Sequence, residues 1–346
     1  MVEYLFGGKE DFLDFLSNIG ELDKVGIIAD SDLDGVSSAV FLEKILGYFE
    51  ISVSSLDFAR EMISSEKIES YKKKGITKIF ILDIPQESVD FEGLKKLEEN
   101  FDVFMIDHHP FNYKYLTEKK AIKTVSADCV GWTLFNIGVE EGYLNEDEWA
   151  WLACAVAFSE FSYKKQENFE LITKYYPDFK SDSLATSTPG LIARKISSAL
   201  IYYNYDFNTI YTLIKERNLD KFSEALRIIE EEIDRKIETF FDNAEYFPDK
   251  KLYFYRLDSP YDIKSYLSTL LSKMKEDHTF IIYSAKVDRV SISARNQSKN
   301  PDMNLLLRNC IVGLNNAFGG GHPASSGAKI NKEDIEQFKE NLLKNI

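Results

Sequence analysis

Short apolar runs alternate with amphipathic stretches over about the first 130 residues of the chain. The runs 24–30, 51–57, 77–83 and 102–107 predict strands, and the stretches 35–50 and 64–75 between them predict helices. Nearly continuous apolar strands that alternate with helices are typical of a doubly wound, mainly parallel sheet. Ligands bind such sheets outside the carboxyl ends of the strands. The pattern therefore predicts an α/β domain with its site at that edge.

The pattern becomes helical after about residue 130 and later returns to strands. Helices are predicted over 129–144, 146–161 and 188–203, and over a long charged stretch, 219–247, which suits a connector and a packed core helix equally. Strands are predicted over 252–257, 279–285 and 289–295, followed by a glycine-rich turn, 316–330, and a terminal helix, 332–346. We therefore expect an N-terminal domain over 1–200, a helical connector over 201–249 and a smaller α/β domain over 250–346.

Composition limits the class of protein. An apolar content of 44% with 14% aromatic residues is that of a globular chain. The three cysteines are widely spaced, so neither a disulfide framework nor a CxxC site is indicated. The first residues lack a basic signal region, and the longest apolar run, 151–158, is too short to cross a bilayer. We expect a cytoplasmic protein without a membrane partner.

Acidic side chains gather where three of the four N-terminal strands are predicted to end. Aspartates at alternate positions of an extended segment lie roughly 7 Å apart, and each pair repels by about 2 kcal/mol at an effective dielectric of ~20. One aspartate at a strand end is explained equally well as a helix cap or turn residue. Carboxylates and imidazoles gathered at one edge of the sheet need a positive charge that neutralises their repulsion. These residues are Asp30, Asp32, Asp34, Asp83, Asp107, His108 and His109.

Divalent cations are the positive charge that these side chains favour as a partner. Mixed carboxylate and imidazole ligands suit Mn, Mg or Zn, and the excess of oxygen favours Mn or Mg. Two such ions bridged by one carboxylate activate water and stabilise the attacking and leaving oxygens of a phosphoryl group. Adjacent histidines point apart, so one of His108 and His109 can bind metal while the other faces substrate.

The predicted C-terminal domain offers a site for an anion. Gly319, Gly320 and Gly321 predict a loop whose backbone N–H groups form a phosphate-binding nest. Arg295 and His322 can add side-chain donors. A glycine triplet alone is equally typical of a tight turn, so the interpretation depends on these two neighbours and on the separate metal domain.

Four motifs in this order resemble the DHH phosphoesterase superfamily with its DHH-associated C-terminal domain: DSDLDG (30–35), ILD (81–83), DHHP (107–110) and GGGHPASSG (319–327). The resemblance covers nearly the whole chain. The form D-x-D-x-D-G is similar to the RecJ-like branch, because the nanoRNase and cyclic-dinucleotide branches usually carry a histidine where this chain has Ile28. The compact length resembles archaeal RecJ-like proteins.

The resemblance implies a metal-binding role for the acidic residues. It makes Asp32 a ligand of the first metal, Asp34 of the second, Asp83 the bridging carboxylate and His108 a further ligand. Where the family has an aspartate in a helical A-[IV]-G-D segment, this chain has AFSE, which places Glu160 there. The longer glutamate arm changes the expected geometry of the second metal.

Other roles implied by the resemblance concern the transition state and the substrate. Asp30 becomes a ligand or an outer-shell acid, Asp107 orients or ligates, and His109 stabilises the transition state. Arg295, His322 and the glycines 319–321 bind the phosphate or terminal nucleotide of the substrate.

The implied activity is a Mn- or Mg-dependent exonuclease that acts in replication or repair and trims single-stranded DNA or RNA to mononucleotides. The net charge of −15 argues against wide contact with nucleic acid. It fits an alternative enzyme of the same class better, an oligoribonuclease or cyclic-dinucleotide phosphodiesterase with a short substrate. A pyrophosphatase is a weaker alternative, because that branch lacks the GGGH domain type.

A replication scaffold is the alternative from another class. Some RecJ-like proteins associate with the GINS complex, and some have lost activity. Glu160 and the acidic composition favour this alternative modestly. The intact DSDLDG and DHH motifs oppose it, because an idle cluster of carboxylates destabilises the fold.

Overall fold

The computed structural model describes residues 2–59, 63–111, 113, 116, 121–204 and 206–346. The chain divides into two compact units, Met1–Leu226 and Arg227–Ile346, and each contains a six-stranded sheet. The expected two-domain α/β class is confirmed. The domain limits expected at residues 200 and 249 stay a prediction.

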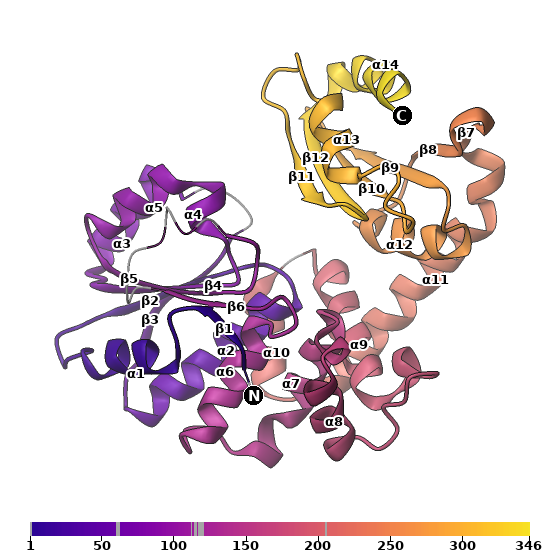
Figure 1. Ribbon diagram of the computed structural model, residues 1–346. Helices are drawn as coiled ribbons and strands as arrows, with labels where there is room; N and C mark the ends of the chain where they lie inside the picture. Colours follow the sequence, from indigo (N-terminus) through magenta and orange to yellow (C-terminus); the bar gives the residue numbers. More distant parts are fainter. Residues whose placement is uncertain (1, 60–62, 112, 114–115, 117–120, 205) are drawn as a thin grey trace. The chain divides into compact units, whose positions relative to one another are not determined.

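The sheet of the N-terminal unit has the order β1-β6-β5-β4-β2-β3 (Figure 1). Strands β2 to β6 are parallel, and β1 is antiparallel to β6. The four predicted strands correspond to β2, β3, β4 and β5, whereas β1 and β6 were not anticipated. The strands are β1 (Tyr4–Phe6), β2 (Val25–Ala29), β3 (Val53–Phe58), β4 (Lys78–Leu82), β5 (Asp102–Asp107) and β6 (Ala121–Thr124).

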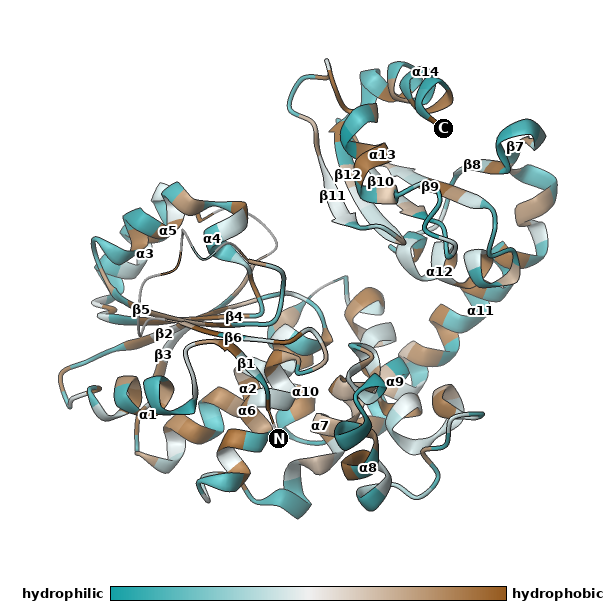
Figure 2. Cartoon of the chain, viewed as in Figure 1, coloured by the Kyte–Doolittle hydropathy of each residue, from teal (hydrophilic) through white to brown (hydrophobic). Residues whose placement is uncertain are grey.

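Helices cover both faces of this sheet, which explains why its strands are apolar throughout. Along β4, Phe80 and Leu82 pack with the helices α1, α2 and α6, whereas Ile79 and Ile81 pack with α3 and α5. Figure 2 shows hydrophobic residues along the central strands and both colours on the covering helices. These helices are α1 (Lys9–Ser17), α2 (Leu33–Tyr48), α3 (Ser65–Lys74), α4 (Gln86–Val89), α5 (Phe91–Glu98) and α6 (Val130–Glu140).

Further helices complete the N-terminal unit and lead into the C-terminal one. The predicted helices at 129–144, 146–161 and 188–203 are found with their ends moved by a few residues at most, and the long predicted helix ends at Asn243. In the described part of the chain, no helix has the length and apolar character needed to cross a membrane. The helices are α7 (Glu146–Ser159), α8 (Gln166–Tyr175), α9 (Thr188–Tyr202), α10 (Phe207–Lys215) and α11 (Leu219–Asn243).

The strand order reverses between β2 and β4, so the connections that leave these two neighbours run to opposite faces of the sheet. Such a switch point leaves space for a ligand at the carboxyl ends of the strands. Asp30 directly follows β2, and Asp83 directly follows β4. The topology therefore brings two acidic motifs of the sequence together.

The segment DSDLDG is not an extended row of aspartates, as the alternate spacing suggested. Asp32 is the N-cap of α2 and accepts a hydrogen bond from the Gly35 N–H at 3.0 Å. Asp34 lies in the first turn of this helix, which begins at Leu33. Capping satisfies a backbone donor that an extended segment would leave open. The three aspartates therefore occupy different local structures: Asp30 follows the strand, Asp32 caps the helix and Asp34 lies inside it.

The sheet of the C-terminal unit has the order β11-β12-β10-β9-β8-β7, in which only the neighbours β8 and β9 are parallel. Helix α12 packs against β9 and β10, and α13 and α14 pack with the other face around Ile292 and Ala328. The elements are β7 (Glu245–Phe247), β8 (Leu252–Arg256), α12 (Lys264–Met274), β9 (Thr279–Ala285), β10 (Arg289–Arg295), α13 (Met303–Cys310), β11 (Phe318–His322), β12 (Ser325–Asn331) and α14 (Ile335–Asn345).

The glycine-rich segment was expected to be a loop, and this was wrong. Gly319, Gly320 and Gly321 lie in β11, which pairs with β12 and forms one edge of the sheet. Only Pro323 and Ala324 connect the two strands. Pairing with β12 gives the glycines regular strand partners, which composition alone does not reveal.

We expect Gly35→Ala to destabilise the N-terminal unit. A Cβ at residue 35 would lie 2.2 Å from the Asp30 carbonyl oxygen and 2.7 Å from its nitrogen, so the turn must shift. Overpacking of this kind typically costs about 1–3 kcal/mol.

Gly47, exposed near the end of the same helix, is the matched control, because a Cβ added there would meet nothing within 4 Å. Its replacement by alanine should stabilise by about 0.5–1 kcal/mol. Urea unfolding measures both variants, and equal effects would contradict this interpretation.

Candidate metal centre

Asp83 is the most constrained acid at the carboxyl edge of the N-terminal sheet. Its φ of 61° is one that residues other than glycine rarely adopt. Its side chain is 1% exposed, and Oδ1 has no hydrogen-bond partner among the described residues. Burial raises its pKa well above the ordinary value, and repulsion from Asp34 and Asp32 adds to this. The turn thus holds an uncompensated carboxylate in place.

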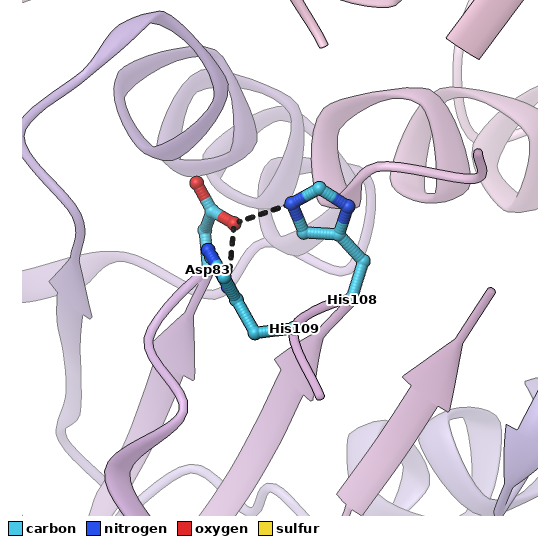
Figure 3. A group of neighbouring side chains, drawn as sticks. All are labelled: Asp83, His108 and His109. Carbon is cyan, nitrogen blue, oxygen red and sulfur yellow. Dashed lines mark ion pairs between the residues drawn. The ribbon is translucent and has the colours of Figure 1, made fainter. Parts of the chain in front are cut away.

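His108 presents a ring nitrogen to this carboxylate. Its Nδ1 lies 3.1 Å from the Ser126 carbonyl, which can only accept, so Nδ1 carries the hydrogen. Nε2 lies 3.4 Å from Asp83 Oδ1 (Figure 3), and in the neutral ring it faces this carboxylate oxygen with a lone pair. Two electron-rich atoms in this arrangement require a cation or a proton between them. A histidine fixed through its other nitrogen is the usual form of a metal ligand.

His109 is held in a different way. Its Nδ1 is 2.8 Å from Asp107 Oδ1, its backbone N–H donates to Asp107 Oδ2, and its side chain is 33% exposed. Burial opposes protonation of the ring, but the hydrogen bond to Asp107 and the negative charges of Asp107, Asp32 and Asp30 together outweigh it and raise the pKa of His109. Burial also opposes ionisation of Asp107, but the hydrogen bond from His109 and the charge of Lys123 hold the pKa of Asp107 below its ordinary range.

The structure brings the predicted ligands together in two sets. Ligand atoms of Asp30, Asp32 and Asp83 all lie within 4.8 Å of one another, and so do those of Asp83, His108 and His109. Ligand atoms around one Mg²⁺ lie at most about 4.2 Å apart, twice the metal–oxygen distance. Small side-chain adjustments therefore suffice, and the donors fit a divalent cation. Asp83 is common to both sets.

Asp34 and Glu160 belong to neither set. Both Asp34 oxygens accept backbone N–H groups at the start of α6, from Val130 at 2.9 Å and Gly131 at 2.7 Å. His108 Nε2 lies 3.9 Å from Asp34. Glu160, the C-cap of α7, is half-buried, and both burial and repulsion from Asp32 and Asp34 raise its pKa well above the ordinary value. Glu160 thus lies near the cluster, and its role as a ligand, like that of Asp34, stays a prediction.

Two charged residues of this region were missed in the sequence. Lys123 of β6 is fully buried between Asp107 and Glu87, and Glu87 of α4 is also fully buried. The available signal was a lysine within the short apolar segment 121–125, next in sequence to the DHH strand. Such a lysine usually stays at the surface, and only the pairing of β5 with β6 shows its partners.

The predicted anion site of the C-terminal unit contains Arg295 and His322. Arg295 pairs with Ser325 of β12, and Ser325 pairs with His322 of β11, so the three residues form one row across the sheet. Arg295 Nε is buried and has no hydrogen-bond partner within the described part of the chain, and burial lowers the pKa of the guanidinium group. At Gly321, φ is 147° and a Cβ would lie 2.6 Å from the Ser325 carbonyl oxygen. A side chain cannot replace this glycine.

We expect Asp83→Asn to stabilise the protein when divalent metal is removed. A folded-state pKa raised by burial means that ionisation opposes folding. The loss of stability begins as the pH rises above the unfolded-state pKa, near 3.8, and is complete above the folded-state pKa. Asparagine keeps the shape and tolerates a left-handed backbone. In chelator near pH 8 the variant should melt a few degrees above the wild type, with no difference near pH 4.

Thermal unfolding with and without Mn²⁺ measures this effect. Mn²⁺ should raise the melting temperature of the wild type and not that of Asp83→Asn. The contrasting control is Asp107→Asn, which removes a compensated charge with a lowered pKa and should destabilise near pH 8. A metal-free Asp83→Asn protein less stable than the wild type near pH 8 would rule out an uncompensated charge at this position.

Comparison with known proteins identifies both units. The DHH family, N-terminal domain, matches residues 24–178, and the DHHA1 domain matches residues 252–346. A comparison with curated protein sequences gives no match.

Solved structures share the fold at low identity. RecJ in complex with Mn²⁺ from Thermus thermophilus has a TM-score of 0.67 and 12% identity, over 96% of this chain and 53% of that chain. The DHH domain of a member of a ribosomal protein family has a TM-score of 0.69 and 16% identity, over 97% of this chain and 89% of that one. CDC45 from Entamoeba histolytica has a TM-score of 0.64 and 12% identity, over 97% and 98% of the two chains.

The chain thus spans about half the length of the RecJ chain, and at these identities the similarity concerns the fold. The two domain matches cover its motifs in the expected order. The chain belongs to the DHH phosphoesterase superfamily, with an N-terminal DHH domain, a DHHA1 domain and a RecJ-like fold.

Proposed function

We propose that the chain is a divalent-metal-dependent phosphodiesterase of the RecJ type, which hydrolyses single-stranded DNA or RNA to mononucleotides. The observation that carries this proposal is the pair of ligand sets that share the buried carboxylate of Asp83, whose Oδ1 accepts no hydrogen bond among the described residues. Members of the superfamily are typically metal-dependent hydrolases. A shared carboxylate is the arrangement that a two-metal phosphoryl-transfer site requires.

The proposed cofactors are two divalent ions, with Mn²⁺ preferred to Mg²⁺. Asp30, Asp32 and Asp83 would hold one ion, and Asp83 and His108 would contribute to the other. An imidazole ligand favours Mn²⁺, because Mg²⁺ prefers oxygen ligands and water. When bound, two such ions generate a nucleophilic water and neutralise charge on the phosphoryl oxygens.

His109 supplies a donor to the substrate in this proposal. Its Nδ1 is committed to Asp107, so Nε2 is the ring nitrogen left to contact a phosphoryl oxygen. The raised pKa of His109 favours the protonated ring, which donates from Nε2 and stabilises the charge that develops in the transition state. Asp107 thus acts by orienting His109, one of the two roles that the sequence left open for it.

The C-terminal unit would bind the phosphate of the substrate. Arg295 has a buried guanidinium nitrogen without a partner among the described residues, and His322 lies in the same row of the sheet. A phosphate oxygen satisfies such a donor through a charge-assisted hydrogen bond. The glycines of β11 leave this part of the sheet free of bulky side chains.

Two other functions have observations in their favour. The net charge of −15 favours a short substrate, as in an oligoribonuclease or cyclic-dinucleotide phosphodiesterase. The fold similarity to CDC45 favours a replication scaffold with weak or no activity and GINS as a partner, because that relative is non-catalytic. The shared carboxylate of the two ligand sets favours an enzyme over a scaffold.

We expect the purified protein to degrade single-stranded substrates in the presence of Mn²⁺. End-labelled DNA and RNA of several lengths should give mononucleotides with Mn²⁺ and stay intact with a chelator. Asp83→Asn is the inactive control, because it removes the shared charge. Cleavage confined to oligomers of a few nucleotides would favour the short-substrate enzyme. Intact substrates under all conditions would favour the scaffold.

We expect Arg295→Met to weaken substrate binding more than turnover. The substitution removes a charge-assisted hydrogen bond and keeps the apolar stem of the side chain. The loss of such a bond costs about 1.5–3 kcal/mol, so KM should rise about tenfold or more. Mn²⁺ affinity should not change, since Arg295 lies in the other unit from the metal ligands. Arg256→Met, at an exposed position of β8, is the control. An unchanged KM for Arg295→Met would refute the phosphate site.

A further inference from the structure

We propose that Lys123 is a positioning residue for His109, an inference that rests on the proposed function. Lys123 of β6 lies directly opposite Asp107 of β5 in the register of the two strands. Its Nζ is 2.6 Å from Asp107 Oδ2 and 2.8 Å from Glu87 Oε1, and all three side chains are 0% exposed. A chain of polar contacts therefore runs from Glu87 through Lys123 and Asp107 to His109.

Lys123 determines how Asp107 can serve His109. Because Lys123 occupies Oδ2, the carboxylate is fixed with Oδ1 toward the imidazole, where His109 Nδ1 lies at 2.8 Å. The Nδ1 hydrogen is then committed to Asp107, and Nε2 is left to face the substrate. Without the ammonium group, rotation of the Asp107 carboxyl would release this constraint on the ring.

The same lysine also connects the two acidic motifs of the site. Glu87 lies in α4, four residues after Asp83, and Asp107 ends the strand that leads into the two histidines. Through its ion pairs with Glu87 and Asp107, Lys123 thus connects the segment that follows Asp83 to the end of the strand that leads to His109. Buried ion pairs are often no more stable than apolar residues of similar size. Stability alone therefore does not account for three buried charges beside the site.

The chain contains a matched control for this pair. Lys78 of β4 lies opposite Asp102 in the register, at the other end of β5, and its Nζ is 3.0 Å from Asp102 Oδ2. Its side chain is 9% exposed. Asp102 is 46% exposed, so Lys78→Met removes a more exposed cross-strand pair from the same strand, at the end of β5 away from the metal centre.

The first experiment observes His109 without any need for activity. The chain has four histidines, so ring ¹⁵N signals can be assigned by substitution of each one. At a pH where the His109 ring is neutral, the wild type and Lys78→Met should show one fixed tautomer with hydrogen on Nδ1. Lys123→Met should lose it and show exchange between tautomers. The double variant Glu87→Gln/Lys123→Met removes the second buried carboxylate, folds without that repulsion and should show the same loss. Unchanged His109 signals in both variants would overturn the proposal.

The second experiment separates positioning from structural support. Loss of a residue that orients a functional side chain typically costs about 10- to 100-fold, so Lys123→Met should lower kcat by that factor. KM should stay within about twofold of the wild type, because the substrate-binding residues are unchanged. Equal kcat losses in Lys123→Met and Lys78→Met would overturn the positioning role. If the wild type hydrolyses no substrate, the proposed function is refuted. The positioning role of Lys123 is tested separately, because the ¹⁵N signals of His109 do not depend on activity.

Discussion

Repulsion among buried carboxylates at the ends of β2 and β4 is the constraint on which the site depends. Asp83 combines three unfavourable features: its backbone is left-handed, its Oδ1 accepts no hydrogen bond among the described residues, and its side chain is buried. Strand β4, which is buried along its whole length between two layers of helices, holds the turn in place. Packing in the core of the N-terminal unit thus offsets the unfavourable backbone and burial of Asp83. Strained residues at functional sites persist only where the surrounding structure holds them in this way.

The protein compensates the other carboxylates of this edge. Asp32 accepts the Gly35 N–H, Asp34 accepts two N–H groups at the start of α6, and Asp107 is paired with Lys123 and His109. Asp83 differs from these three, because its Oδ1 accepts no hydrogen bond among the described residues, although His108 Nε2 lies 3.4 Å and His109 Nδ1 3.8 Å from it. Asp107 thus belongs to the frame of the site, whereas Asp83 is common to both sets of candidate ligands.

The sequence predicted the elements whose signals are local. Long apolar runs identified β2 to β5, and the aspartates at their ends indicated which edge carries the site, because parallel strands share a carboxyl edge. The directions of Asp32 and Asp34 were not predicted, because an early helix start at Leu33 competes with an extended strand end. Gly319–Gly321 suggested a loop, because the pairing of β11 with β12 is a tertiary contact. Lys123 was missed for the same reason, since its two carboxylate partners come from other elements.

The negative net charge limits how a phosphodiester can approach the protein. Charges more than about 8 Å apart are largely screened at physiological salt, so the overall charge of −15 repels a long polyanion mainly where it runs along the surface. The end of a nucleic-acid strand contacts few surface carboxylates and needs few hydrogen-bond donors. The donors that the structure offers, a buried guanidinium nitrogen of Arg295 and the nearby His322, suffice for one phosphate group. Under the proposed function, one such anchor would suit the removal of terminal nucleotides better than the binding of the interior of a long nucleic-acid strand.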